Sequence, residues 1–484
     1  IKFGPIFYIS FLAEDMKNGD QSVYAILAKV LLEVEELKKE NALLRQENAE
    51  LRSRLNSNSK NSSRPPSSDG YRKTTSPALP KTSKGIQGGK KGHKGDTLRQ
   101  TNNPDKFVIV SPSECSCGHQ FAQSECELSS KRQVFELPQP KLEVTEYQIH
   151  TAKCPKCGLI HQGEAPKNVT APVQYGNQAK AFAVLLNTNY KVPFKKIQQM
   201  FKDLYGYPIN ESTIYSASKL CYDQLEESEE VIKSNVSNSD VVHADESGLR
   251  VLGKLHWLHT ATTQSFTYLF VHQKRGQLAL NSDKSILDKI DGWLVHDCWS
   301  SYFKFTGLKH AICGAHILRE LQGLIESGQS KWAKEFHTFL LDLYKTPFHK
   351  RLLKMEDLKI TYLKICDKGE KQEPPPHKTS GKRGKPKRTK GRNLVERLIR
   401  EMDAVLAFAF NEEVPFTNNL AERDIRPVKV KMKVSNCFRT LTGAEIYARI
   451  ESFISTARKN NRNIFQELTN TMDGHNFLVP LTTA

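Results

Sequence analysis

Two short apolar runs that each end in an aspartate constrain the fold of this chain most. Val241–Ala244 leads into Asp245, and Trp293–His296 leads into Asp297. Such runs predict short buried strands with an acid at the carboxyl end. A third acid, Glu422, lies where Asn418 and its neighbours predict a capped helix start. Any one of these acids alone would more often be a surface charge, but together they predict a divalent-ion site.

The segments around these acids predict a mixed sheet. Three strands, 241–244, 255–260 and 266–271, are expected to form a meander, with Glu246, Ser247 and Gly248 ending the first. A loop and a helix between Leu278 and Ile290 lead to the fourth strand, and a fifth strand from His310 runs into a helix over 317–326. About a hundred residues then separate this helix from Glu422, including a helix over 393–410. That is too long for a link inside a compact domain, so we expect an insertion.

The positive charge of the chain is concentrated in two tracts rich in Pro, Gly and Ser. The formal net charge is +18. Residues 60–106 hold 11 Lys/Arg against 3 Asp/Glu, and residues 368–392 hold 10 against 2. They could be solvated linkers, but tracts of this kind usually bind nucleic acid or an anionic membrane. Since no apolar run reaches the roughly 18 residues of a membrane span, nucleic acid is favoured.

Several features bear on the compartment and on the start of the chain. Ten cysteines with uneven spacing do not predict a secreted disulfide framework. Residues 3–13 are apolar but make a poor signal peptide. Met16 is an alternative start, so residues 1–26 are treated as an uncertain N-terminus. We expect a cytoplasmic, nucleoid-associated protein with no membrane contact.

Apolar residues from Leu27 onward repeat every seven residues. Positions of type a and type d are occupied by Leu27, Val34, Asn41, Asn48 and Leu55, and by Val30, Leu37, Leu44 and Leu51. This seam predicts a parallel two-stranded coiled coil, a leucine zipper, whose two asparagines set the register. A single amphipathic helix packed on its own domain is the alternative. We therefore expect a homodimer or a higher assembly.

Two closely spaced cysteine pairs predict structural zinc. Cys154 and Cys157 have the spacing of a zinc knuckle, followed by a glycine. Cys115 and Cys117 are separated by only one residue, so His119 or Cys126 could replace one ligand. Strand-like alternation from Val134 to Ile149 joins the pairs. Four free thiols on two turns are the alternative.

Residues 179–220 have helical periodicity. Phe194, Ile197, Phe201 and Leu204 share one face, and the next helix, capped by Asn210 or Ser212, turns Ile214, Ala217 and Cys221 inward. A break at residues 205–208 separates the two. This is the outline of a DNA-reading helix-turn-helix, although any helical hairpin looks the same.

The three acids suit phosphodiester chemistry with two divalent ions about 4 Å apart. In this interpretation Asp245 bridges two Mg²⁺ ions (Mn²⁺ is an alternative), Asp297 holds one and Glu422 the other. Arg423 and Arg426 could clamp a phosphate. His243 is expected in the core.

Other side chains could bind or position DNA. Trp299 could stack on an unpaired base, although packing is the more common role of such a residue. Cys313 with His316 could have a structural or DNA-end-positioning role. In the second basic tract, the candidate DNA contacts are Lys382, Arg383, Lys385, Lys387 and Arg388.

Several motifs together resemble the insertion sequence 66 family of bacterial transposases. They are the segment 56–69, the cysteine pairs, the segments 243–247, 295–299 and 313–316, and the segment from Asn418 to Pro427. The resemblance implies a DDE transposase with a ribonuclease H-like core, catalytic Asp245, Asp297 and Glu422, and zinc on Cys115, Cys117, Cys154 and Cys157. The one-residue gap of the first pair departs from the more common spacing. Small accessory proteins of the same element often act with this family.

We therefore predict a multidomain α+β and α/β protein that cleaves the terminal inverted repeats of an element and joins the 3′-hydroxyl to target DNA. A non-catalytic zinc-containing regulator and a structure-specific nuclease are the competing hypotheses. The expected parts are a coiled coil (27–57), a basic disordered linker (58–106), a zinc-binding domain (107–172), a helical DNA-binding region (173–235), a core in two parts (236–326 and 414–445) around a helical insertion (327–413), and a C-terminal helical tail (446–484).

Overall fold

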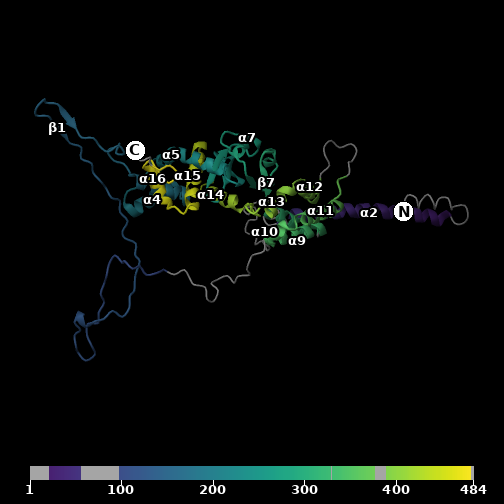
Figure 1. Ribbon diagram of the computed structural model, residues 1–484, viewed down its shortest axis with the longest axis horizontal. Helices are drawn as coiled ribbons and strands as arrows, with labels where there is room; N and C mark the ends of the chain where they lie inside the picture. The colour runs from purple at the N-terminus through teal and green to yellow at the C-terminus, as the bar shows by residue number, and fades with distance from the viewer. Residues whose placement is uncertain (1–20, 56–60, 62–97, 329, 377–387, 481–484) are drawn as a thin grey trace. The chain divides into compact units, whose positions relative to one another are not determined.

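A computed structural model gives the fold and describes residues 21–55, 61, 98–328, 330–376 and 388–480 (Figure 1). The chain divides into two compact units. The larger unit comprises Ile1–Pro80, Asn177–Val192 and Ser216–Ala484, and the smaller comprises Lys81–Gly176 and Pro193–Tyr215. The architecture is mixed α/β, with a long N-terminal helix, a small cysteine-rich region and a core of one mixed sheet with many helices. Most of the first basic tract lies outside the described residues.

The larger unit is built on a five-stranded sheet with the order β5-β4-β3-β6-β7. The strands are β3 (Val241–Val251), β4 (Lys254–Thr262), β5 (Thr267–His272), β6 (Trp293–His296) and β7 (Lys309–Ile312). β3, β4 and β5 form the predicted antiparallel meander, and β6 and β7 add in parallel. The five predicted strands are therefore confirmed.

The first strand of this sheet is longer than expected. The prediction that Glu246, Ser247 and Gly248 end it is wrong, because β3 pairs with β4 as far as Val251. Leu252 and Gly253 have positive φ angles of 49° and 76° and close a two-residue hairpin. β6 pairs with β3 only over Val241–His243. The parallel neighbour therefore lies beside only the first part of β3.

Alternation along β3 decides which helices each side chain meets. Val242 and Ala244 pack in one apolar cluster with α6 (Glu226–Ser237). Leu249 and Val251 pack in another with α14 (Asn419–Ser435) and α15 (Leu441–Lys459). Successive side chains of a strand point to opposite faces, so Asp245 lies on the α14 face and Glu246 on the other.

The segment predicted as a C-terminal helical tail forms α15 and α16 (Ile464–Met472), and α15 belongs to the core. β5 is an edge strand whose backbone needs hydrogen-bond partners. Ser452 Oγ accepts a hydrogen bond from Leu269 N (2.9 Å), and Thr456 Oγ1 accepts one from Thr267 N (3.1 Å). Side chains of α15 therefore accept hydrogen bonds from two backbone N–H groups along this edge.

Helices fill the long interval between the fifth strand and α14. They are α8 (Gly314–Gly328), α9 (Lys331–Lys345), α10 (Phe348–Leu352), α11 (Met355–Gln372), α12 (Lys390–Arg400) and α13 (Met402–Phe410). The helix expected over 393–410 is two helices that meet at Glu401. Trp332, Phe336 and Tyr362 form a core here with Val295 and Ala311 from the sheet.

The helix expected between Leu278 and Ile290, next to a loop, is much shorter than predicted. This range contains only α7 (Gln277–Leu280) and the short turn η4 (Leu287–Lys289). Another short turn, η5 (Tyr302–Lys304), follows β6. Ser282 Oγ donates back to Ala279 O (2.7 Å), a local bond that competes with helix extension.

The predicted pair of helices before the sheet is confirmed as helices. α4 (Phe194–Tyr205) ends at Gly206, whose φ of 79° suits a left-handed cap, and α5 (Glu211–Gln224) follows. Ile197 and Phe201 are buried as expected, but Leu204 is 45% exposed. α3 (Asn177–Val184) and a π-helical turn η3 (Leu185–Asn189) precede them. DNA reading by this pair stays a prediction.

The cysteine-rich region has little regular structure. It holds η2 (Gln123–Glu125) and a hairpin of β1 (Thr151–Lys153) with β2 (Ile160–Gln162). The strand expected from Val134 to Ile149 is wrong, since those residues form no strand. Val134 and Leu137 are 88% and 89% exposed, so no apolar layer supports a strand there.

The long helix α2 (Gln21–Leu55) covers the predicted coiled coil. Its heptad leucines are exposed, with Leu37 at 56%, Leu44 at 50% and Leu51 at 49%. Pairing through this seam stays a prediction. Over the described part of the chain, no helix has the length and apolar character to span a bilayer.

Candidate active site

Asp245 and Asp297 lie at the same level of neighbouring parallel strands. The pairing of His243 with Val295 puts each aspartate two residues further along its chain. Parallel strands are roughly 4.8 Å apart, so the two acids are adjacent. Directly after Asp297, Cys298 has a φ of 65°, which is uncommon for a residue with a side chain. This turn lets Asp297 Oδ1 accept a hydrogen bond from Trp299 N (3.0 Å).

The start of α14 is fixed to β3 by one buried amide. Asn418 Nδ2 donates to Ala244 O (2.7 Å), and Asn418 Oδ1 accepts from His243 Nδ1 (2.9 Å). The backbone N–H of Asn418 also donates to Cys313 Sγ (3.2 Å). Glu422, in the first turn of α14, is thereby held near the strand that carries Asp245. His243 is a core residue, as expected.

A second anchor holds the same helix turn from the other side. The buried Asp424 carboxylate pairs with Lys459 Nζ (2.6 Å) of α15. It also accepts from the hydroxyls of Thr262 (2.7 Å) and Thr267 (3.2 Å). Glu422 therefore lies between two points at which α14 is bound to the sheet.

The electrostatics of the site fit a cation. Burial, and then the charges of Glu246, Asp297 and Glu422, raise the pKa of Asp245 to about 7. Like charges raise a carboxyl pKa because ionisation adds repulsion, and a divalent ion removes that repulsion. Among the described residues the three acids do not form a single cluster within 4.8 Å. Ligands that surround two ions about 4 Å apart need not all lie within 4.8 Å of one another.

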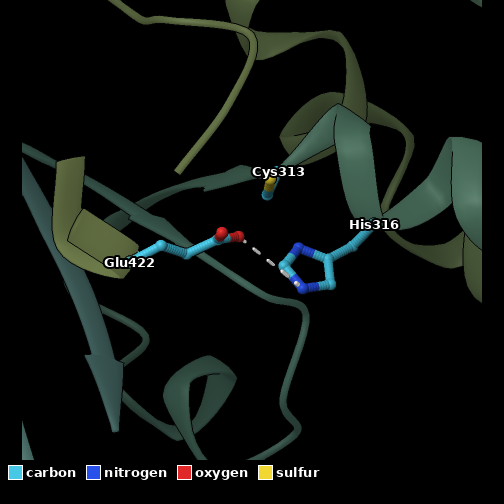
Figure 2. A group of neighbouring side chains, drawn as sticks. All are labelled: Cys313, His316 and Glu422. Carbon is cyan, nitrogen blue, oxygen red and sulfur yellow. Dashed lines mark ion pairs between the residues drawn. The ribbon is translucent and has the colours of Figure 1, made fainter. Parts of the chain in front are cut away.

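A tighter group of potential ligands shares Glu422. Cys313 follows β7, His316 lies in the first turn of α8, and their ligand atoms lie with that of Glu422 within 4.8 Å of one another. Figure 2 shows the three side chains pointing toward one space, with His316 Nε2 4.0 Å from Glu422 Oε1. Burial lowers the pKa of His316, but the interaction with Cys313 outweighs burial and raises it to about 9. The sequence singled out Cys313 and His316 but not their proximity to Glu422.

A close backbone approach brings α8 to α14. Gly314 N donates to Phe416 O (2.8 Å), and a Cβ at position 314 would overlap the Phe416 ring. Only glycine fits this contact. The spacing between the Cys313 and Glu422 segments therefore depends on Gly314.

Trp299 packs, as the sequence favoured. Its ring lies 4.4 Å from the Arg275 guanidinium, which also faces Trp257 at 5.0 Å. Arg275 Nε donates to the buried Glu246 (2.7 Å), and Tyr302 OH donates to the other oxygen of that carboxylate (2.6 Å). The sequence missed this cluster behind Asp245, because its members are distant along the chain.

The structure describes three of the predicted DNA contacts. Arg423 and Arg426 are exposed on α14, on the helix that carries Glu422. Arg388 pairs with Glu396 of α12. The others, Lys382, Arg383, Lys385 and Lys387, lie outside the described residues.

Each cysteine pair of the small unit occupies its own turn. Gly118 N donates to Cys115 O (2.8 Å), Gly158 N donates to Cys154 O (2.9 Å), and both glycines have positive φ. Hydrogen bonds from the segments of Cys117 and Cys157 lower the pKa of Cys115 and Cys154 respectively, which favours thiolates. Across the described residues, the four sulfurs do not form one cluster within 4.8 Å.

Comparison with known families identifies the chain. A family model described as the Transposase IS66 family matches residues 172–446, more than half of the sequence. The chain belongs to this family. Membership in this DDE transposase family implies catalytic phosphoryl transfer and DNA binding.

Two further family models match this IS66 transposase. The zinc-finger binding domain of transposase IS66 matches residues 112–158, a range that contains Cys115, Cys117, Cys154 and Cys157. A family of unknown function matches residues 21–99, which include α2. A search of curated proteins gave no match.

Proposed function

We propose that this transposase cleaves the phosphodiester bond at the terminal inverted repeats of its element and joins the freed 3′-hydroxyl to target DNA. The supporting observation is the common location of Asp245, Asp297 and Glu422 on two adjacent strand positions and one facing helix turn. The sheet order, with three antiparallel strands followed by two parallel ones, supports a ribonuclease H-like core.

The three carboxylates would hold two Mg²⁺ ions, with Mn²⁺ as an alternative. Asp245 would contribute to both, Asp297 to one and Glu422 to the other. When bound, such ions supply activation of the attacking oxygen and stabilisation of the leaving oxygen. Asn418 and Asp424 keep Glu422 in position from either side. Arg423 and Arg426 would bind the phosphates that flank the scissile bond.

The remaining parts would bind and pair the DNA ends. Pairing of α2 through its exposed leucines would join two protomers, so that one dimer holds two element ends. Basic residues 60–106 and 368–392 would contact phosphates, which predicts a steep loss of DNA affinity with added salt. The α4–α5 pair would read sequence, and accessory proteins of the element could join the assembly. The enzyme would act in the cytoplasm, at the nucleoid.

Structural zinc on Cys115, Cys117, Cys154 and Cys157 would organise the small unit. Val110 and Leu137 are 90% and 89% exposed, so this region lacks an apolar core of its own. Metal binding often supplies the folding energy of such regions. Removal of this zinc should increase proteolysis within residues 107–172.

The test is Glu422→Gln, with Glu413→Gln as the matched control because Glu413 is exposed. We expect the first variant to bind element-end DNA as the parent does, but to lose Mg²⁺-dependent strand cleavage. The control should cleave normally. Equal cleavage by both variants would overturn the assignment of Glu422. If the parent and both variants all fail to cleave, a non-catalytic regulator would be favoured. Cleavage without joining of the 3′-end would favour a nuclease.

A further inference from the structure

We propose that Cys313, His316 and Glu422 form a separate site for one ion such as Zn²⁺, and that this ion competes with the catalytic ions for Glu422. The three ligand atoms come from the end of β7, the first turn of α8 and the first turn of α14. They lie within 4.8 Å of one another and point into one space (Figure 2).

Two buried atoms of this group need a polar neighbour. His316 Nδ1 and Glu422 Oε1 are both inaccessible to solvent and have no hydrogen-bond partner among the described residues. Buried polar groups are usually paired, and the exceptions call for a cause such as an ion. The 4.0 Å between His316 Nε2 and Glu422 Oε1 is too long for a direct hydrogen bond. An ion bound to His316 Nδ1 and Glu422 Oε1 would give both of these unpaired atoms a partner.

The ligand types select the ion. A sulfur, an imidazole and one carboxylate are typical ligands of Zn²⁺ and related transition metals, whereas Mg²⁺ prefers oxygen ligands alone. Cys313 is fully buried, and its sulfur accepts a hydrogen bond from Asn418 N at 3.2 Å. Binding would displace the thiol proton to solvent. Three protein ligands would leave a fourth position for water or for an oxygen of the DNA.

Sharing of Glu422 makes the site regulatory. Existence of the Cys313–His316–Glu422 site does not depend on the proposed cleavage activity, but its effect on cleavage does rest on the proposed function. A carboxylate drawn toward Cys313 and His316 is withdrawn from Asp245 and Asp297. Zinc would then inhibit strand cleavage, and excess Mg²⁺ would reverse the inhibition.

The first experiment measures binding directly with Co²⁺ as the probe. The full chain is used with Cys115, Cys117, Cys154 and Cys157 all replaced by Ser, so that the finger thiolates do not contribute. We expect one equivalent of Co²⁺ to produce the ultraviolet sulfur-to-cobalt charge-transfer band. Cys313→Ser in this background should abolish the band. Cys366→Ser, a change at another buried cysteine, should leave it intact.

Two milder variants keep the test valid if Cys313→Ser fails to fold. His316→Gln and Glu422→Gln should each weaken Co²⁺ affinity by more than about tenfold, since loss of even an indirect metal partner often costs that much. No band in the quadruple variant would overturn the proposal. The proposal would also be overturned if His316→Gln and Glu422→Gln bound Co²⁺ with unchanged affinity.

Competition separates this site from the proposed function. Added Mg²⁺ should weaken Co²⁺ binding in the quadruple variant. A Co²⁺ band that Mg²⁺ does not weaken would support the new site but refute both the sharing of Glu422 and its assignment to a Mg²⁺ ion. Mg²⁺-dependent cleavage without any Co²⁺ band would support the proposed function and refute the new site.

Discussion

The side-chain amide of Asn418 donates a 2.7 Å hydrogen bond to the carbonyl of Ala244, one residue before Asp245. This bond ties the helix that carries Glu422 to the strand that carries Asp245, although the two segments are 174 residues apart in sequence. The geometry of the candidate site therefore depends on a residue that we do not expect to touch metal or DNA.

Replacement of Asn418 by Ala tests this dependence. It leaves Ala244 O and the His243 ring without their buried partner, so we expect a loss of about 1–3 kcal/mol in unfolding free energy. Strand cleavage by the folded fraction should fall further, because Glu422 is released from β3. Urea unfolding and a cleavage assay measure the two effects. Asn419→Ala is the control, since Asn419 is exposed; equal cleavage by the two variants would show that the tie is dispensable.

Gly314→Ala should damage the site through packing. The added methyl group overlaps the Phe416 ring, so the segment before α14 must move away from α8. Overpacking of this kind costs about 1–3 kcal/mol. Gly328→Ala, in the same helix but in open space, should leave stability almost unchanged. If thermal unfolding and cleavage are alike in the two variants, the contact between Gly314 and Phe416 does not control the site.

Asp245→Asn should stabilise the metal-free protein above neutral pH. The folded pKa of about 7 exceeds the ordinary value of 3.8, so the folded state binds more protons between these pH values. Its unfolding free energy therefore falls as pH rises through this window, while the asparagine variant escapes the loss. With chelator present, we expect a gain on the order of 4 kcal/mol at pH 8 and none near pH 3, since each pKa unit corresponds to about 1.4 kcal/mol.

Denaturation at several pH values, with Asp240→Asn as the exposed control, measures this gain. Mg²⁺ should reduce the difference in unfolding free energy between Asp245→Asn and the parent, because only the parent retains the full set of carboxylates. A constant stability difference across the pH range would rule out the raised pKa of Asp245, caused by burial and by the neighbouring carboxylates, as its origin.

Lys459→Met tests the anchor on the far side of Glu422. It leaves the buried Asp424 charge without its cation, and removal of one member of a buried ion pair costs about 3–5 kcal/mol. Lys429→Met, at an exposed position of α14, should have little effect. The double variant Lys459→Met, Asp424→Asn should recover part of the loss in urea unfolding. Without any recovery, the ion pair would not explain the effect.

The sequence predicted the sheet well because its strands are apolar, rich in β-branched residues and separated by clear turns. It mispredicted the end of β3, because Glu246, Ser247 and Gly248 resemble a strand stop. Pairing with β4, together with Arg275 and Tyr302 from distant segments, keeps Glu246 inside a strand. Tertiary contacts of this kind leave no local signal.

The candidate site was predictable only in part. Strand ends and a capped helix start marked Asp245, Asp297 and Glu422. The approach of Cys313 and His316 to Glu422 depends on the contact between Gly314 and Phe416, which lie about a hundred residues apart. No periodicity relates such positions. The leucine repeat predicted the helix α2, but a repeat alone cannot show which surface covers it.

The cover that α15 provides for β5 has a consequence for defective copies of the gene. A frameshift or stop codon before Leu441 would remove the serine and threonine hydroxyls that occupy the N–H groups of β5. The bared strand would then be free to recruit strands from other chains, as open sheet edges do. Such truncated proteins should precipitate or be degraded rather than accumulate as competitors of the intact enzyme.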